Sequence, residues 1–182
     1  MRPRRIFRPV PGPRRWGTLL LGCVAVAGAL VLATAMPGDL FGSAPHERVW
    51  TAAAAEVRVV DGATLRLGDR ILRLEGLTVP ERDRARCPGV PGEDCAAGAA
   101  EALARMVQGE ALECRIRGQD RHGRALGLCQ AAGVALNAAL VGAGWAVAED
   151  GSLAPQEALA RQQGRGLWAP GATRPEAWRS RF

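Results

Sequence analysis

Residues 111–130 constrain the fold more than any other part of this 182-residue chain. Two strand-like segments, "ALECRIRG" and "GRALGLCQ", flank the turn-like "QDRH". If Arg121 and His122 form the tip of an antiparallel hairpin, Cys114 lies opposite Cys129. Opposed residues of an antiparallel pair have Cβ atoms close enough for a disulfide bond. The pattern therefore predicts a hairpin closed by a Cys114–Cys129 bridge.

Two further cysteines, Cys87 and Cys95, enclose the Pro- and Gly-rich loop "PGVPGED". With Cys23 set aside, the chain has an even number of cysteines, as is typical of exported domains with disulfides. We predict Cys87–Cys95 as the second bridge. The alternatives are four buried free thiols or a zinc site, and the sequence lacks the CxxC and HxxxH spacings typical of zinc ligands.

A run without charges, "GTLLLGCVAVAGALVLATAM", occupies residues 17–36 and is long enough to cross a bilayer as a helix. Arginines concentrate in residues 1–16, which we expect to stay in the cytoplasm. We favour a membrane anchor, because the run is longer than the core of a usual signal peptide. The alternative is a signal peptide cleaved after the small-x-small residues 33–35. We expect inner-membrane anchoring with the domain in the periplasm or cell envelope, or else secretion.

The formal net charge of +6 suggests a nucleic-acid partner, but the excess lies in the N-terminal segment. Six of the 24 basic residues precede residue 16. The rest of the chain therefore has 18 basic residues and 18 acidic residues. The globular part is therefore neutral, and any contact with nucleic acid must come from the local placement of arginines. The expected partners are the membrane through residues 17–36, an unidentified protein, and nucleic acid through local contacts only.

The remaining sequence alternates between strand and helix patterns. Three short strands, "VRVV", "ATLRL" and "RILRLEGL", are separated by turn signals within residues 57–77. An amphipathic helix is predicted at 95–107, ended by Gly109, and two more follow the hairpin, one through residues 136–140 and one at about 152–163. This order predicts a mainly β, α+β fold, namely a five-stranded OB-type Greek-key barrel with about three packed helices. An α+β domain with a half-open sheet is the alternative.

The domain boundaries follow from changes in composition. Residues 1–16 form the basic N-terminus and 17–36 the apolar segment, and the Pro-, Gly-, Ser- and Ala-containing residues 37–54 are predicted as a linker. The folded domain is predicted at 55–170, and 171–182 as an irregular tail.

Five motifs occur in order in the predicted domain: "VVDGATLRLG", "LRLEGLTVPE", "DRHGR", "GWAVA" and "GRGLW". Together they resemble the staphylococcal nuclease, or thermonuclease-like, family over residues 56–170, in its exported bacterial form. The resemblance implies calcium-dependent hydrolysis of nucleic-acid phosphodiesters. It also implies that Arg73 and Arg124 clamp the phosphate and that Glu81 assists the attacking water. If the site is inactive, we expect these three residues to form an ionic network with one another.

The metal site departs from the family pattern, because Ala63 and Thr78 stand where the family has its calcium-binding aspartates. Asp61 remains and is expected to cap the turn through its side chain. Calcium requires about six to eight oxygen ligands, so we expect its affinity to be lost and no cofactor to bind. The favoured interpretation is an impaired or inactive nuclease acting as a binding or scaffold module. The alternatives are an active endonuclease with a metal site rebuilt around Asp61, Glu81 and Asp83, and a structural envelope protein.

Overall fold

The computed structural model describes residues 48–179 of the chain. The predicted cytoplasmic N-terminus, the apolar segment 17–36 and most of the predicted linker lie outside the described residues. Within residues 48–179, every helix is either too short or too polar to cross a membrane.

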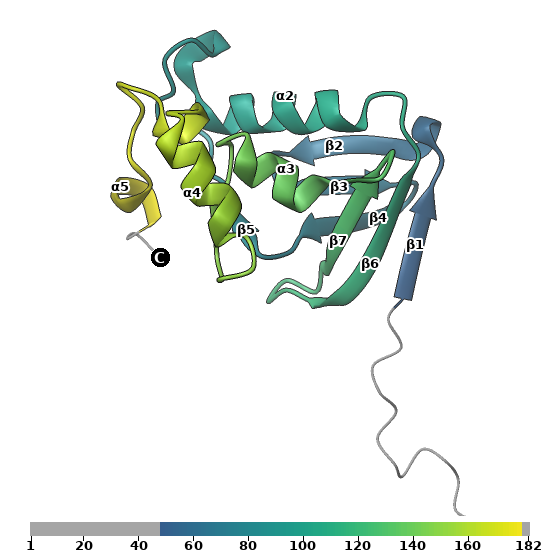
Figure 1. Cartoon of the computed structure of the whole chain (residues 1–182). Helices are drawn as coiled ribbons and strands as arrows, with labels where there is room; N and C mark the ends of the chain where they lie inside the picture. The colour runs from purple at the N-terminus through teal and green to yellow at the C-terminus, as the bar shows by residue number, and fades with distance from the viewer. Residues whose placement is uncertain (1–47, 180–182) are drawn as a thin grey trace, which may run out of the picture. The chain divides into compact units, whose positions relative to one another are not determined.

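Seven strands form one sheet with the spatial order β1-β6-β7-β4-β3-β2, and β8 pairs with β7 (Figure 1). The pairs are antiparallel except for β4 and β7, which run parallel. The strands are β1 (Arg48–Ala52), β2 (Val57–Asp61), β3 (Thr64–Leu67), β4 (Arg70–Leu74), β6 (Leu112–Gln119), β7 (Ala125–Ala131) and β8 (Val134–Ala135). The five predicted strands are β2, β3, β4, β6 and β7, and their order is consistent with a partly open OB-type fold.

Of the strands that were missed, β1 is the longest. β1 lies in the last part of the segment predicted as a linker, so that prediction is wrong for Arg48–Ala52. The strand pairs with the outer edge of β6, where half-buried Trp50 lies opposite Cys114. The guanidinium of Arg70 lies 4.8 Å from the centre of the Trp50 ring, within the range of a cation–π contact. These contacts attach the first described residues to the sheet.

The predicted hairpin is present with its disulfide. Cys114 pairs with Cys129 in the ladder, and the two are bonded. The register shifts between Ile116 and Gly118, so the two-residue tip at Arg121 and His122 is wrong by one position. The loop instead closes through a hydrogen bond from the Asp120 N–H to the Arg124 carbonyl, and Gly123 takes a φ of 77° that favours glycine.

Four helices are described: α2 (Cys95–Val107), α3 (Leu136–Gly142), α4 (Ala154–Gln162) and α5 (Pro175–Arg179). The bounds of α2 match the prediction, and its N-cap Asp94 accepts a hydrogen bond from the Ala96 N–H. The tail was predicted to be irregular, and α5 corrects that prediction. Its Trp178 is only 4% exposed, so burial of an aromatic side chain holds this helix on the domain.

The core has two parts. Leucines of the strands and of α2 and α3 fill the larger part, for example Leu65, Leu72 and Leu103, which have no exposed surface. The smaller part surrounds the predicted Cys87–Cys95 disulfide, which is present, and contains Trp168 and Trp178. Three short 3-10 helices connect these elements: η2 (Ala54–Glu56), η3 (Pro91–Glu93) and η4 (Gly166–Trp168).

Two motif glycines hold the C-terminal segments together. Gly144 and Gly166 have φ values of 80° and 51°, and a Cβ on either would lie within 2.4 Å of a backbone oxygen of the other segment. The Leu167 N–H donates to the Gly144 carbonyl at 2.8 Å. Glycine is needed at both positions because the two backbones cross at this point.

Candidate functional site

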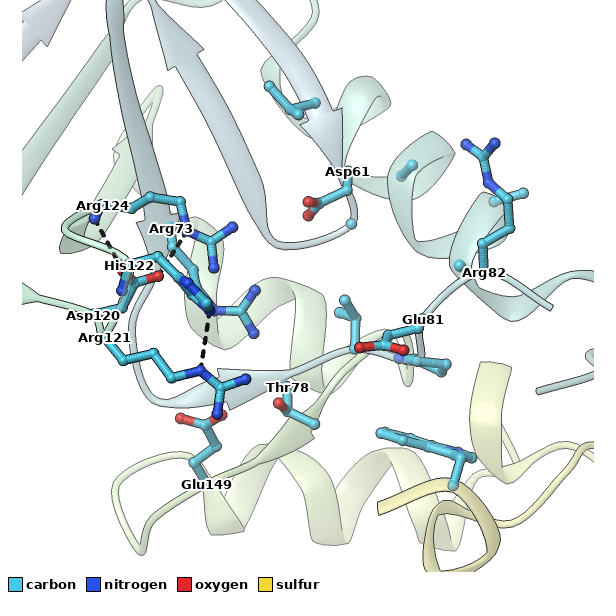
Figure 2. Close-up of a pocket in the computed structure, with 18 residues that line it drawn as sticks. Asp61, Arg73, Thr78, Glu81, Arg82, Asp120, Arg121, His122, Arg124 and Glu149 are labelled. Atoms are coloured by element: carbon cyan, nitrogen blue, oxygen red, sulfur yellow. Dashed lines mark hydrogen bonds and ion pairs between the residues drawn. The ribbon is translucent and has the colours of Figure 1, made fainter. Parts of the chain in front are cut away.

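A cavity of about 720 Å³ opens between the β2–β3 turn, the end of β4, α2 and the β6–β7 hairpin. Five of the residues singled out from the sequence line it: Asp61, Arg73, Thr78, Glu81 and Arg124. Figure 2 shows Arg73, Arg124, Arg121 and His122 on one side of this pocket, with Glu81 and Arg82 on the other. The same side also carries the carboxylates of Asp120 and Glu149, so it has three arginines against two acidic residues.

The sheet brings the two arginines together. Arg73 lies between Leu72 and Leu74, both of which point into the core, so its own side chain points to the outer face. Arg124 immediately precedes β7, whose first residue pairs with Leu72 in the parallel ladder. The side chain of Arg73 forms no hydrogen bond or ion pair with the residues described here. Its donors are therefore available to a ligand.

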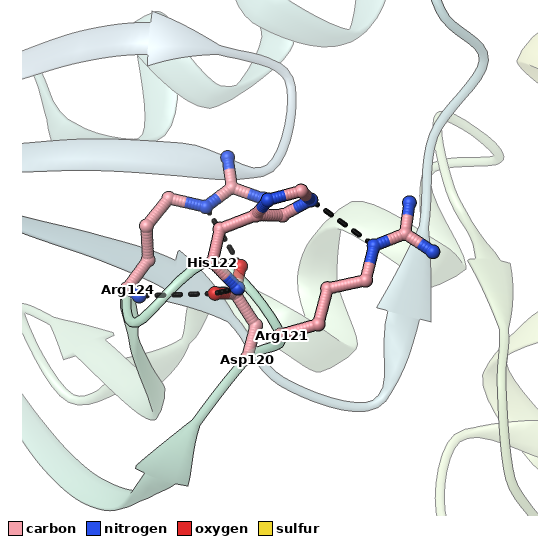
Figure 3. Close-up of polar contacts among 4 residues, drawn as sticks. All are labelled: Asp120, Arg121, His122 and Arg124. Atoms are coloured by element: carbon pink, nitrogen blue, oxygen red, sulfur yellow. Dashed lines mark hydrogen bonds and ion pairs between the residues drawn. The ribbon is translucent and has the colours of Figure 1, made fainter.

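The second arginine is held by its own hairpin (Figure 3). Arg124 Nε donates to Asp120 Oδ2 at 2.7 Å, and Asp120 Oδ1 accepts the backbone N–H groups of His122 and Arg124. Partial burial raises the pKa of Asp120, but these hydrogen bonds outweigh it and lower the pKa to about 2. Arg121 Nε donates a hydrogen bond to His122 Nε2 at 3.0 Å.

The network predicted among Arg73, Glu81 and Arg124 is wrong. Arg124 pairs with Asp120, while Glu81 is 57% exposed and its nearest cation is Arg84, at 3.8 Å. An exposed pair at this distance contributes little to stability. Glu81 therefore remains a solvent-exposed carboxylate at the rim of the pocket.

The turn that carries Asp61 is fixed by packing. Asp61 Oδ1 accepts the Ala63 N–H at 2.8 Å, which is the predicted capping contact. A Cβ on Gly62 would lie 2.5 Å from the Cβ of Ala99, so only glycine lets this turn pack so closely on α2. Ala63 does not line the pocket and has no exposed surface. Its methyl group belongs to the core.

Thr78 belongs to a small second sheet. It lies in β5 (Leu77–Thr78), which pairs antiparallel with β9 (Val147–Ala148) of the "GWAVA" motif. The next residue, Glu149, donates its N–H to the Gly76 carbonyl and lines the pocket. The sequence analysis missed Glu149 as a pocket residue, and its position directly after that motif was the available signal.

Other pocket residues were missed or misplaced. Asp120 opens the "DRHGR" motif and was not assigned a role, although Asp at such a position commonly binds the turn's N–H groups. Trp178 reaches the pocket from α5.

Asp83, a candidate ligand of a rebuilt metal site, does not line the pocket. Among residues 48–179, no three His, Cys, Asp or Glu side chains gather closely enough to hold a metal ion.

Comparison with known families agrees with the motif pattern. The model of the family described as "Staphylococcal nuclease homologue" matches residues 71–170, more than half of the chain. The resemblance to that family is thereby confirmed, while the exported bacterial character stays a prediction. No curated protein matches the chain. The match covers Arg73, Thr78, Glu81 and Arg124 but begins after Asp61.

Proposed function

We propose that this chain, which belongs to the staphylococcal nuclease homologue family, binds nucleic-acid phosphodiesters with little or no hydrolysis and acts as an exported, membrane-anchored binding module. One observation carries the proposal. The pocket keeps its arginine side, whereas the two positions of the family's calcium aspartates hold a buried methyl group at Ala63 and a hydroxyl at Thr78.

The arginine side suits a phosphodiester. Guanidinium groups present planar, forked donors that match phosphate oxygens. Arg73 has no competing partner within the described residues, and Arg124 uses only its Nε on Asp120, which leaves its terminal nitrogens for a ligand. In OB folds, the loops after the first and fourth strands flank the oligonucleotide-binding face. Here these loops carry Asp61 and Asp120, on either side of the pocket.

The residues present do not fit a calcium ion. Calcium, the metal of this family, would polarise the scissile phosphate when bound. It is held by several carboxylates with six to eight oxygens in all. Asp61 already accepts the Ala63 N–H, Asp120 is engaged by Arg124, and Ala63 offers only its methyl group. Glu81 and the two arginines then act on the phosphate with no bound cation to polarise it, so the expected hydrolysis is small.

The experiment uses the full chain in a nonionic detergent. Cleavage of a labelled single-stranded DNA is measured with calcium, magnesium, manganese or a chelator, beside Glu81→Gln. Binding of the labelled dinucleotide pTpT is measured by fluorescence anisotropy with wild type and Arg73→Ala. We expect binding that Arg73→Ala weakens, and no metal-dependent cleavage above the Glu81→Gln control.

Each other outcome points to a different function. Metal-dependent cleavage that Glu81→Gln abolishes would overturn the proposal in favour of an active endonuclease with a rebuilt site around Asp61 and Glu81. An absence of pTpT binding, with Arg73→Ala indistinguishable from wild type, would favour a structural envelope protein.

The membrane part of the proposal rests on the uncharged residues 17–36. Fractionation of expressing cells, followed by mass measurement of the intact protein, tests it. A full-length chain that resists extraction by salt and carbonate supports the anchor. A soluble chain that begins near residue 36 would show a cleaved signal instead.

A further inference from the structure

A row of arginines crosses the outer face of the sheet beside the pocket. Strands β2, β3 and β4 place three arginines on this face, Arg58, Arg66 and Arg73, and their one acidic residue, Asp61, lines the pocket. Arg58 lies directly opposite Arg66, and Arg66 lies directly opposite Ile71. This face is therefore basic, although the globular part as a whole is neutral.

The pairing of Arg58 with Arg66 has no structural explanation within the domain. Like charges directly opposite each other in an antiparallel pair are destabilising. Both side chains are exposed. Arg58 donates only to the carbonyls of Ala55 and Val57, and Arg66 has no side-chain hydrogen bond or ion pair within the described residues. Within residues 48–179, no ion pair compensates this repulsion.

The row is continuous with the pocket. Arg73 follows Ile71 by two residues on the same strand, so both side chains lie on the same face, about 7 Å apart along the strand. Neighbouring strands are about 4.8 Å apart, which places the backbone of Arg58 about 10 Å from that of Ile71 across the sheet. Ile71 is 37% exposed and offers an apolar surface between cations.

We propose that Arg58, Arg66 and Ile71 form a track that binds a single-stranded nucleic acid continuing from the Arg73–Arg124 pocket. The inference rests on the proposed function and extends its ligand from one phosphodiester to a strand. Arg58 and Arg66 bind successive phosphates, and Ile71 contacts a base or sugar between them. Continuity with the pocket favours a strand over the other polyanionic surface available to this protein, an anionic lipid bilayer.

The test measures how affinity depends on strand length. The full chain is held in phosphatidylcholine nanodiscs, and anisotropy is recorded with labelled pTpT and with a labelled twelve-nucleotide thymidine strand. One double variant combines Arg58→Gln and Arg66→Gln. The control is a second double variant that combines Arg105→Gln and Glu101→Gln. Arg105 is an exposed arginine of α2 outside the pocket, paired with Glu101. A far-ultraviolet circular dichroism melt confirms that each variant folds.

The track predicts a length-dependent loss. The variant that combines Arg58→Gln and Arg66→Gln should bind the twelve-nucleotide strand more weakly, on the order of tenfold at 0.1 M salt. The slope of the logarithm of the binding constant against the logarithm of the salt concentration should become shallower by about 1.4, or about 0.7 for each lost phosphate contact. The affinity of this variant for pTpT should not change, because that ligand fits within the pocket. The control variant should bind both probes as wild type does.

Three results would overturn the track. If the double variant binds the long strand as wild type does while pTpT still binds, the track is wrong and the pocket proposal stands. If neither probe binds wild type, both proposals fail. If the nanodisc-held chain instead binds added phosphatidylglycerol vesicles and the double variant loses only that binding, the row serves lipid rather than nucleic acid.

Discussion

Asp120 Oδ2 lies 2.7 Å from Arg124 Nε, so one member of the arginine pair is held in place by a carboxylate four residues earlier in its own hairpin. The same carboxylate accepts two backbone N–H groups of the loop. Asp120 therefore links the shape of the hairpin tip to the direction of the guanidinium. Asp120 also lines the pocket, and its carboxylate is engaged by these three hydrogen bonds.

The first prediction concerns Asp120→Asn. The amide cannot accept all three hydrogen bonds as strongly, so Arg124 becomes mobile and affinity for pTpT falls by roughly tenfold. Anisotropy titration measures the change, and Asp69→Asn, an exposed turn residue outside the pocket, is the matched control. Unchanged pTpT affinity in a folded Asp120→Asn variant would show that Arg124 needs no positioning.

The second prediction concerns pH. Because the pKa of Asp120 falls from its ordinary value near 3.8 to about 2 on folding, ionised Asp120 stabilises the fold above pH 4. That contribution is lost as the pH falls from about 4 to about 2. The melting temperature of wild type should exceed that of Asp120→Asn at pH 6, and the difference should shrink across this window. A difference that stays constant from pH 6 to pH 2 would contradict the assigned hydrogen bonds.

Features set by local spacing could be predicted from the sequence, and those set by distant partners could not. The bounds of α2 follow from its own periodicity and cap, and the Cys114–Cys129 register follows from a short hairpin. β1 was missed because its pairing partner, β6, lies far along the chain.

The candidate site shows the same division. The positions of Arg73 and Glu81 in one pocket follow from ordered motifs. The choice of partner does not, because Arg124 could pair with Glu81 or with Asp120, and only the folded loop decides between them. The shift at the hairpin tip has the same origin, since Gly123 permits a longer loop that alternation alone does not reveal.

The third prediction concerns the Cys114–Cys129 bridge, which closes a sequence separation of 15 residues. The chain-entropy model gives about 3 kcal/mol for a loop of this length, so Cys114→Ala with Cys129→Ala should lower the free energy of unfolding by about that amount. Urea denaturation of the oxidised proteins measures it. Mass spectrometry of unreduced peptides should show both bridges, and any other pairing would refute the hairpin register.

The last prediction restores the missing carboxylates. Ala63→Asp with Thr78→Asp should create calcium-dependent cleavage of single-stranded DNA, raised roughly 100-fold over wild type, because a bound cation adds its charge to that of the arginines in stabilising the transition state. Ala63 has no exposed surface, so Asp there lowers stability unless calcium binds, and calcium should raise the variant's melting temperature. The matched control is Ala63→Asn with Thr78→Asn, which has the same size without the charge. If the Asp variant folds and binds calcium but does not cleave, Ala63 and Thr78 do not account for the inactivity proposed above, and the arrangement of Glu81 with respect to the arginines would be the next feature to change.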